Sequence, residues 1–453
     1  MLLLTPTPGI VGRVLRRGDE GYEHYRQGTC WHARVPDQYP EYIIVATDDD
    51  DVVGAVQLAR REGLTVAVRS GGHSWSGSHL RDDSVLIDMV NMRRVEIDPD
   101  ALTAVAEPGA KGSEVAEMLA AHQLYFPTGH NVGISLGGYL LQGGFPWAGR
   151  EYGPSCMSVT GIDAVTMRGE LIHADEYENS DLLWAARGAG PGFFAVVTRF
   201  YLKLYPRRPV TMTTSFVFPR DCAPAVFRFL HDVGTRTPTE LTAAIARLDL
   251  AEGEPCVMLS ATAFTDTEQE AREQLAIFDE LSIRARALAV REHRMASHTT
   301  LTKESQSVID DNLRWIADNI LTHADFDQMW PTLERMLDTW PPAPSHLVAA
   351  CWSGSPNEPK RPSMAFSVED ELYYAMYTAW EDPADDETYI AWTTDHMRSW
   401  EPQSTGTMLA DENLLHRPSR FVSAANMVTL DECRATWDPE GRFVSWLRRP
   451  DET

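Results

Sequence analysis

Residues 69–77 read R-S-G-G-H-S-W-S-G, and they follow directly after the apolar run L-T-V-A-V at residues 64–68. The run predicts a buried strand, and the small residues after it form a loop of consecutive backbone N–H groups. Such a loop suits a phosphate or a pyrophosphate. Gly71 and Gly72 let the backbone approach a ligand closely, and His73 points at whatever the loop wraps. A plain Gly/Ser turn that carries an ordinary histidine is the alternative interpretation.

A second glycine-rich region spans residues 127–153. Because glycine costs roughly 1 kcal/mol in the interior of a helix, this region cannot be regular structure throughout. It predicts a second ligand wall that is lined by backbone. Its glycines are Gly129, Gly133, Gly137, Gly138, Gly143, Gly144, Gly149 and Gly153.

The first loop resembles the R-S-G-G-H-S element of the FAD-linked oxidases with a vanillyl-alcohol-oxidase type, or PCMH-type, flavin domain. Other segments resemble the same family in the same order, and the last of them resembles a berberine-bridge-type tail. The resemblance implies a PCMH-type FAD-binding domain. The segments that carry it are D-V-V-G-A-V at 51–56, G-H-N-V-G at 129–133, R-E-Y-G at 150–153, D-L-L-W-A-A-R-G at 181–188 and W-D-P-E-G-R-F at 437–443. After residue 209, strands alternate with longer helices, which predicts an α+β substrate domain whose antiparallel sheet is covered by helices.

The resemblance implies FAD that is covalently bound through His73 alone. Members with a second link have a cysteine where this chain has Gly129, so the chain resembles the single-link subgroup typified by 6-hydroxy-D-nicotine oxidase. By the same analogy Val132 stands at a gate beside the oxygen-reactive edge of the flavin, and Val197 packs on the adenine or ribose end unless it is a plain core residue. The implied FAD contacts are Arg69, Ser70, Gly71, Gly72, His73, Ser74, Thr128, Gly129, Val132, Gly133, Gly137, Gly138, Gly143, Tyr152, Gly153, Val197 and Asn426.

The sequence indicates less about the half of the chain that binds the substrate. A flavin oxidase of alcohols or amines needs a proton acceptor near the reacting group, and His130, Tyr373 and Tyr377 are the candidates, with Tyr374, Glu369 and Glu371 as further ones. Tyr373 and Tyr377 share one strand face, where they either line a pocket or pack as core. Trp352, Trp380 and Trp392 form an aromatic wall or belong to the core. His293, His298 and His323 are expected to be exposed, and no metal site is expected, since no pair has metal-ligand spacing.

Length and composition bound the remaining possibilities. A chain of 453 residues predicts more than one domain, and P-R-R-P at 206–209 marks the boundary. We therefore expect an FAD-binding domain over 1–206 with its core at about 38–206, a substrate domain over 207–415 and a C-terminal segment, 416–453, that returns to the first domain. A net charge of −26 argues against nucleic acid and anionic membranes as partners. Six scattered cysteines indicate free thiols, and with no signal-peptide or membrane-span pattern we expect a cytoplasmic protein.

The resemblance implies an FAD-dependent oxidase. It would transfer hydride from a small alcohol or amine to FAD and then to oxygen, giving hydrogen peroxide. The alternatives are a dehydrogenase of the same fold that uses another acceptor, and a flavin-bearing binding protein without catalysis. A Rossmann enzyme is disfavoured, because no G-x-G-x-x-G lies between a strand and a helix. The oligomeric state stays open between monomer and homodimer.

The periodicity of the chain predicts its elements. In the first half we expect strands at 42–46, 65–69, 84–88 and 193–205, hairpins at 94–98/103–107 and 161–167/170–174, and helices at 51–62, 111–122 and 181–186. In the second half we expect strands at 211–218, 241–249, 256–263, 364–368 and 373–380, and helices at 223–235, 267–281, 325–340 and 385–400.

Overall fold

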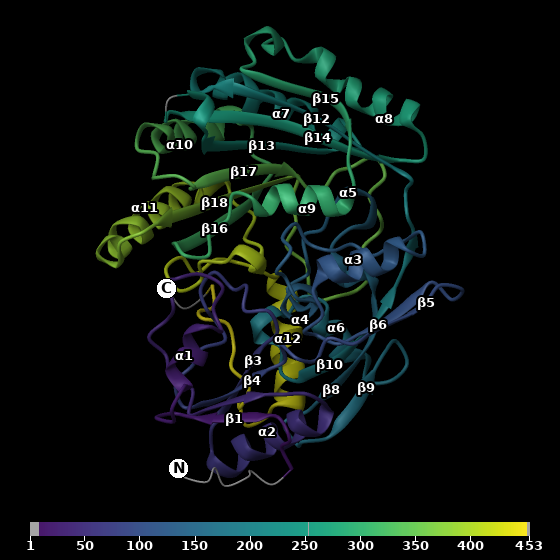
Figure 1. Ribbon diagram of the computed structural model, residues 1–453, viewed down its shortest axis with the longest axis vertical. Helices are drawn as coiled ribbons and strands as arrows, with labels where there is room; N and C mark the ends of the chain where they lie inside the picture. Colours follow the sequence, from purple (N-terminus) through teal and green to yellow (C-terminus); the bar gives the residue numbers. More distant parts are fainter. Residues whose placement is uncertain (1–8, 252, 451–453) are drawn as a thin grey trace.

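The computed structural model describes residues 9–251 and 253–450, which form two stacked bodies (Figure 1). The lower body contains a four-stranded, a five-stranded and a small two-stranded sheet from the first half of the chain, and the upper body is built on one seven-stranded sheet. The fold is α+β, as the sequence predicts. Among the described residues, no helix combines the length and the apolar character that crossing a membrane requires.

The first sheet of the lower body has the order β1-β2-β4-β3. Its strands are β1 (Arg13–Arg16), β2 (Tyr42–Val45), β3 (Thr65–Arg69) and β4 (Ser84–Asp88). Strand β4 is parallel to both β2 and β3, so the loops after these strands leave from the same edge of the sheet. The acidic start of helix α2 (Asp49–Glu62) is capped by Asp48, whose side chain accepts a hydrogen bond from the amide of Asp51.

The second sheet of the lower body is antiparallel, with the order β5-β6-β10-β8-β9. Both predicted hairpins are confirmed, β5 (Val95–Asp98) with β6 (Thr103–Ala106) and β8 (Val159–Val165) with β9 (Leu171–Ala174). Strand β10 (Val196–Lys203) lies between them. The glycine-rich region contains only the short helices α4 (Leu136–Leu141) and α5 (Gly149–Tyr152), and α3 (Gly112–Ala120), β7 (Leu124–Tyr125) and α6 (Ser180–Ala186) flank it.

The upper sheet is antiparallel throughout, in the order β15-β12-β14-β13-β17-β18-β16. Its strands are β12 (Val210–Pro219), β13 (Glu240–Arg247), β14 (Pro255–Thr265), β15 (Ala289–Met295), β16 (Arg314–Thr322), β17 (His346–Cys351) and β18 (Leu372–Trp380). Helices α7 (Ala223–Val233), α8 (Glu268–Leu275), α10 (Phe326–Asp338) and α11 (Asp386–Ser399) accompany it (Figure 1). Helix α9 (His298–Gln306) lies between this sheet and α3.

The predicted strand at 364–368 is wrong. Its backbone amides bond to the end of α6 instead of to a neighbouring strand: Ala365 donates to the carbonyl of Trp184 at 3.1 Å, and Phe366 to that of Arg187 at 2.8 Å. Because these amides already donate to the end of a helix, they cannot donate to a neighbouring strand. The apolar residues of this segment therefore pack between the two bodies in irregular conformation.

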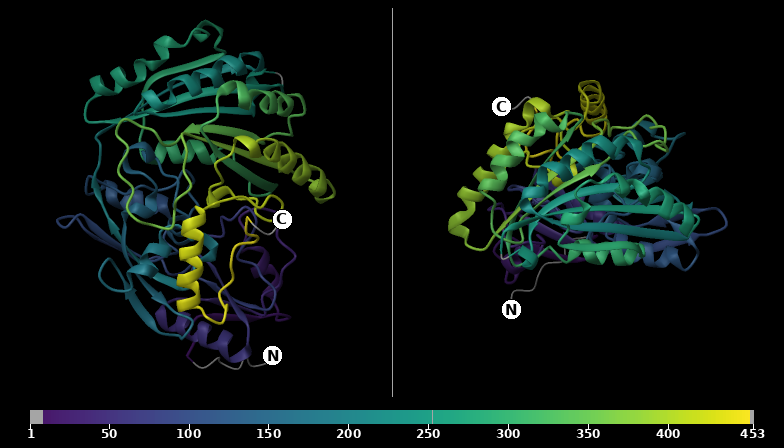
Figure 2. Two further views of the ribbon diagram at one scale, coloured as in Figure 1. Left: turned by 180° about the vertical axis from the view of Figure 1, so that it is seen from behind. Right: turned by 90° about the horizontal axis from the view of Figure 1, so that it is seen from above.

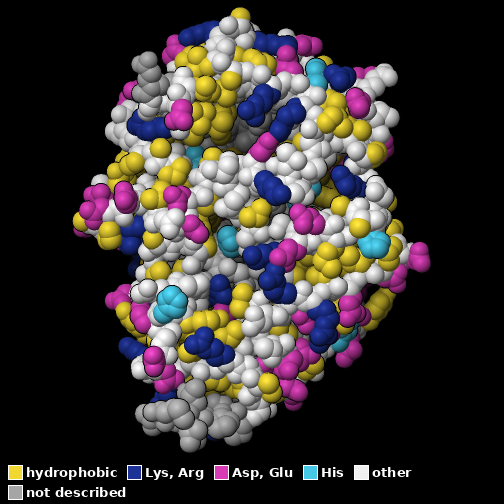
Figure 3. Space-filling model, viewed as in Figure 1, with side chains coloured by type: hydrophobic (Ala, Val, Ile, Leu, Met, Phe, Trp, Pro, Cys, Tyr) yellow, Lys and Arg dark blue, Asp and Glu magenta, His cyan; other side chains and the backbone are white. Residues whose placement is uncertain are grey.

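The C-terminal segment runs back along the lower body (Figure 2, left). Helix α12 (Ala424–Trp437) contacts α6, and the chain after it pairs with β3. The amide of Val66 donates to the carbonyl of Arg442 at 2.8 Å, and the amide of Val444 donates to the carbonyl of Val66 at 3.0 Å. On the face that Figure 3 shows, acidic and basic side chains are interspersed, and a hollow opens in the upper half.

Candidate active site

A cavity of about 730 Å³ is lined by residues of both bodies. From the lower body it receives the loop after β3, the glycine-rich region and β10. From the upper body it receives one face of the seven-stranded sheet and the end of α9. The predicted site residues on its wall are Arg69, Ser70, Gly71, Gly72, His73, Ser74, Gly129, His130, Gly137, Gly138, Val197, Tyr373 and Tyr377.

The loop after β3 presents unused backbone donors. Within the described part of the chain, none of the five consecutive amides from Ser70 to Ser74 donates a hydrogen bond to another residue. Gly72 has φ +71°, and a β-carbon there would lie 2.0 Å from the carbonyl oxygen of Thr29, so this turn requires glycine. A run of free amides around a glycine in this conformation is a nest for an anion.

The side chain of Arg69 fixes the base of this loop. Its guanidinium holds the buried carboxylate of Asp88 at 2.7 and 2.8 Å, and its Nε donates to the carbonyl of Thr29 at 2.8 Å. Arg69 therefore connects the loop after β3 with the loop that contains Thr29 and with Asp88 at the end of β4. Its side chain is used within the protein, which leaves ligand binding to the backbone.

The two glycine loops interlock at three contacts. A β-carbon on Gly71 would lie 2.7 Å from Oγ of Ser135, and one on Gly137 would lie 2.1 Å from Oγ of Ser70. A β-carbon on Gly133 would lie 2.2 Å from Nε2 of His73. Real β-carbons do not approach other atoms so closely, so each of these glycines is needed for the approach of the two loops.

His73 lies on the cavity wall with its ring stacked on Trp31, at a centroid distance of 5.7 Å and an interplanar angle of 9°. Burial, helped by the positive charge of Arg69, lowers the pKa of its imidazole to about 4. The ring is therefore neutral near pH 7. A neutral imidazole in this place is a usable nucleophile.

Tyr373 belongs to a polar cluster that the sequence did not disclose. Its hydroxyl donates to the carboxylate of Asp411 and lies 3.3 Å from the hydroxyl of Tyr377. The other carboxylate oxygen of Asp411 accepts a hydrogen bond from the indole of Trp75 at 2.6 Å. Asp411 is enclosed by protein, and this burial raises its pKa. The sequence held no signal for Asp411, because an isolated aspartate far from the glycine loops matches no motif.

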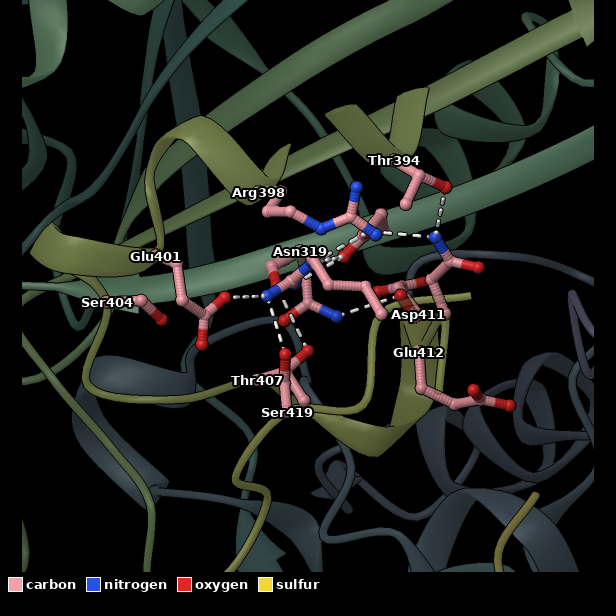
Figure 4. A network of polar contacts seen from close by, with 12 residues as sticks. Asn319, Thr394, Arg398, Glu401, Ser404, Thr407, Asp411, Glu412 and Ser419 are labelled. Atoms are coloured by element: carbon pink, nitrogen blue, oxygen red, sulfur yellow. Dashed lines mark hydrogen bonds and ion pairs between the residues drawn. The ribbon is translucent and has the colours of Figure 1, made fainter. Parts of the chain in front are cut away.

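Asn319 on β16 holds the segment that carries Asp411. Its amide nitrogen donates to the carbonyls of Met408 and Asp411 at 2.9 and 2.8 Å, and its amide oxygen accepts from the amide of Met408 at 2.7 Å. Close by, Arg417 pairs with the fully buried Asp318, which is also on β16. Figure 4 shows Asn319 and Thr407 together beside Asp411. This network fixes the backbone of the segment that carries Asp411.

Aromatic rings surround the remainder of this end of the cavity. His130 meets Trp147 edge to face at a centroid distance of 4.1 Å, and Phe145 packs on Tyr373 at 5.0 Å and on Trp352 at 4.5 Å. Burial lowers the pKa of His130 to about 3, so its ring is neutral. The aromatic wall therefore includes Trp352, while Trp380 and Trp392 pack against α11 residues away from the cavity.

Other candidates lie away from this cavity. Tyr374 points into the helix-covered core, where its hydroxyl lies 2.7 Å from His231. Glu369 pairs with Arg361 at 2.8 Å, and Glu371 is exposed. The prediction that His298 is exposed is wrong: it is enclosed between the two bodies, and its ring lies 3.0 Å from the hydroxyl of Thr128.

Several predicted cofactor contacts also lie outside the cavity wall. Asn426 donates to the carbonyls of Met364 and Ala365 and so anchors α12. Val132 lines a smaller neighbouring pocket of about 390 Å³. The others support the wall from behind: Gly133 packs under His73, Gly143 on Phe366, Tyr152 on Tyr125 and Tyr205, Gly153 on Met157, and Thr128 on His298.

Comparison with known proteins relates this geometry to a cofactor. Residues 40–175 match the model of a family described as FAD binding domain. The FAD-linked oxidoreductase nodO of Hypoxylon pulicicidum is 31% identical over 451 residues, which cover 95% of this chain and 96% of that protein.

Solved structures share the fold at lower identity. The 6-hydroxy-D-nicotine oxidase of Arthrobacter nicotinovorans has a TM-score of 0.84 at 20% identity, covering 98% of this chain and 99% of its own. The glucooligosaccharide oxidase of Acremonium strictum has a TM-score of 0.82 at 18% identity, covering 97% and 96%. At this identity the structures establish similarity of fold alone.

Proposed function

The chain belongs to the FAD-linked oxidoreductases, and from that premise we propose that it is an oxidase of a small alcohol or amine, with FAD attached through His73. The observation that carries the proposal is the run of five amides from Ser70 to Ser74, which have no acceptor among the described residues and lie around a neutral, half-buried histidine on the wall of a large cavity. When bound, FAD accepts a hydride from the substrate and passes the two electrons to oxygen, which leaves as hydrogen peroxide.

The residues present fit this cofactor. The free amides of the loop after β3 suit the pyrophosphate of FAD. The closely packed glycines of the second loop present backbone instead of side chains to the cavity, which leaves room for the cofactor. Apolar side chains at the lower end of the cavity, among them Val66, Val197 and Phe443, suit an adenine ring. Phe145, Trp147 and Tyr373 lie at the other end, where the reacting ring would meet its substrate.

Tyr373 and Asp411 together are the proposed proton acceptor. Burial holds the pKa of Tyr373 well above 10, so its phenol is neutral at physiological pH and cannot act as a base alone. The hydrogen bond to Asp411 removes this obstacle, because the proton of the phenol moves to the carboxylate as the substrate hydroxyl or amine gives its own proton to the phenol oxygen. The raised pKa of Asp411 favours the protonated product of this relay. Tyr377 and His130 are proposed to orient the substrate beside it.

Two measurements test the proposal. Acid precipitation of the purified protein followed by in-gel flavin fluorescence should give a yellow, fluorescent chain, and His73→Ala should release the flavin into the supernatant. The photoreduced protein should then be mixed with oxygen or with a soluble quinone under otherwise equal conditions. Faster reoxidation by oxygen, with hydrogen peroxide formed, supports an oxidase. Slow reaction with oxygen and fast reaction with quinone identify a dehydrogenase, and failure of every alcohol and amine to reduce the flavin would indicate a binding protein.

A further inference from the structure

The cavity wall opposite the glycine loops is the face of the upper sheet that α7, α8 and α10 leave uncovered. Side chains alternate along each strand: Leu241, Ala243 and Ile245 of β13 pack in the helix-covered core, whereas Thr242 and Ala244 line the cavity. The neighbouring strands continue this pattern. The cavity-facing residues of β12, β14 and β17 are Thr213, Ser215, Met258, Ser260, Thr262, His346, Val348 and Ala350.

The strand register places several hydroxyls in one row that starts at the proposed base. Tyr373 is paired with Ala350, Ala350 with Thr242, Thr242 with Ser260, and Ser260 with Ser215. Neighbouring strands are about 4.8 Å apart, so the row is about 19 Å long from Tyr373 to Ser215. Ala350, which has no hydroxyl, follows Tyr373 in this row. The hydroxyls of Thr242, Ser260 and Ser215 come after it in that order.

Among the described residues, the serine and threonine hydroxyls of this row have no hydrogen-bond partner. For Ser215, Thr242 and Ser260 the structure shows no side-chain hydrogen bond to any described residue, and the same holds for Thr262 beside them. Glu240, paired with Thr262 in the register, faces the same cavity. Burial raises the pKa of its carboxyl to about 8, and one carboxyl oxygen accepts a hydrogen bond from the amide of Gly149 at 2.8 Å. Polar groups that are turned into an enclosed space and left unpaired await a ligand or water.

The next row of the same wall is apolar. Ala244 is paired with Val348 on one side and with Met258 on the other, one pleat away from the hydroxyl row. The middle of the wall therefore offers a polar strip and an apolar strip side by side, both made of small or unbranched side chains. Sugars are commonly held by aromatic platforms and charged or amide side chains, and none of the described residues from Ala350 to Ser215 on the polar strip, nor Ala244, Met258 and Val348 on the apolar strip, is of that kind.

We propose that the substrate is a flat, elongated and mostly apolar molecule with oxygen atoms along one edge. Its reacting alcohol or amine lies beside Tyr373, its apolar face lies on Ala244, Met258 and Val348, and its further hydroxyl or ether oxygens meet Thr242 and Ser260. This inference rests on the proposed function, because it takes Tyr373 as the reacting end. Ala350 has no side-chain atom beyond Cβ, so the space between Tyr373 and Thr242 is open.

The test is an anaerobic titration of the flavin-containing protein, in which a bound probe either perturbs the flavin spectrum or reduces the flavin once. Under anaerobic conditions, 5α-androstane-3β,17β-diol and cellotetraose are added separately, and the flavin absorption difference spectrum is recorded. The steroid diol is a flat apolar probe with oxygens at both ends, and it is expected to give a saturable spectral change. Thr242→Val with Ser260→Ala should weaken its binding about five- to thirtyfold, since one hydrogen bond contributes about 1 kcal/mol. Ala350→Leu should block it, and Thr436→Val on the exposed face of α12 should leave it unchanged.

The outcomes separate this inference from the function on which it rests. Saturable binding of cellotetraose alone would overturn the inference in favour of an oligosaccharide, while the oxidase proposal would stand. Equal steroid binding by the wild type and the Thr242→Val/Ser260→Ala protein would also overturn it, as would no response to either probe from a protein whose flavin is bound and reducible. A protein that takes up no FAD would overturn the proposed function itself.

Discussion

His73 and Gly133 come from different glycine loops, sixty residues apart, and meet so closely that a β-carbon on Gly133 would lie 2.2 Å from Nε2 of the histidine. The ring is also stacked on Trp31. The imidazole therefore cannot swing away from an added methyl group without losing that stacking. Its orientation depends on the absence of a side chain at position 133.

Gly133→Ala should consequently impair covalent attachment of FAD while leaving the fold intact. A displacement of the imidazole by about 1 Å is enough to slow a positioned reaction roughly a hundredfold. The measurement is the fraction of fluorescent chain after acid precipitation, as a function of time after FAD is added to the flavin-free protein. Gly28→Ala is the matched control, since a β-carbon there would have only ordinary contacts at 3.5 Å. Equal attachment rates in both variants would show that the contact does not govern the reaction.

The pH dependence of attachment should report the neutral form of His73. Its pKa in the folded protein is lowered to about 4 by burial, so the imidazole carries no proton at any pH above about 5. We expect a rate that is constant between pH 5.5 and about 8 and that falls only as pH drops towards 4. The same shift means that the folded state loses stability as pH falls from about 6.5 to 4, because the unfolded histidine binds the proton more readily. A rate that rises through pH 6.5 would instead indicate an ordinary, exposed imidazole.

The flavin half of the molecule was largely predictable because its signals are local. The apolar run before Arg69 and the glycines after it specify a strand and a loop within ten residues, and the hairpin partners of the second sheet are neighbours in sequence. The predicted helix at 51–62 and the loop that carries His73 lie in the structure where the sequence placed them.

The substrate half was predictable in class but not in detail. Strands β15, β16 and β17 escaped prediction, since their pairing depends on strands up to about a hundred residues away, and the 364–368 segment was misassigned because its amides are taken by the end of α6. Asp411 was missed for the same reason: its role follows from contacts with Tyr373 and Trp75, which are distant in sequence.

Tyr373→Phe should slow reduction of the flavin by substrate about a hundred- to ten-thousandfold, the usual contribution of a positioned general base. Binding of the substrate should change far less, so the loss is expected in kcat rather than in KM. Anaerobic stopped-flow absorbance measures the reduction directly. Tyr374→Phe is the control on the same strand, because its side chain points to the opposite face and its hydroxyl meets His231. If both variants reduce the flavin at the wild-type rate, another group accepts the proton.

Arg417→Met should destabilise the protein by about 3–5 kcal/mol, because it leaves the carboxylate of Asp318 buried without its charge partner. Both side chains are almost fully buried, at 4% and 0% exposure. Chemical denaturation measures the loss, and Arg168→Met provides the comparison: its pair with Glu170 is exposed on both sides and should contribute less than about 1 kcal/mol. Because Arg417 lies on the segment that carries Asp411, the folded variant should also show slower flavin reduction. Similar denaturation midpoints for the two variants would contradict a structural role for the buried pair.

Glu240 makes the stability of the protein depend on pH in a direction opposite to that of His73. Burial raises the pKa of its carboxyl to about 8, whereas an unfolded glutamate titrates near 4.3. Between these values the folded state holds a proton that the unfolded state releases, so stability falls as pH rises, by at most about 1.4 kcal/mol per pH unit. Glu240→Gln cannot ionise, and its amide oxygen can still accept the hydrogen bond from the amide of Gly149, which is 2.8 Å long in the wild type. The variant should therefore gain stability relative to the wild type as pH rises from 5 to 8, measured as the difference between their thermal midpoints. The exposed Glu432→Gln serves as the control, and a difference that stays constant with pH would show that Glu240 is ionised throughout this range.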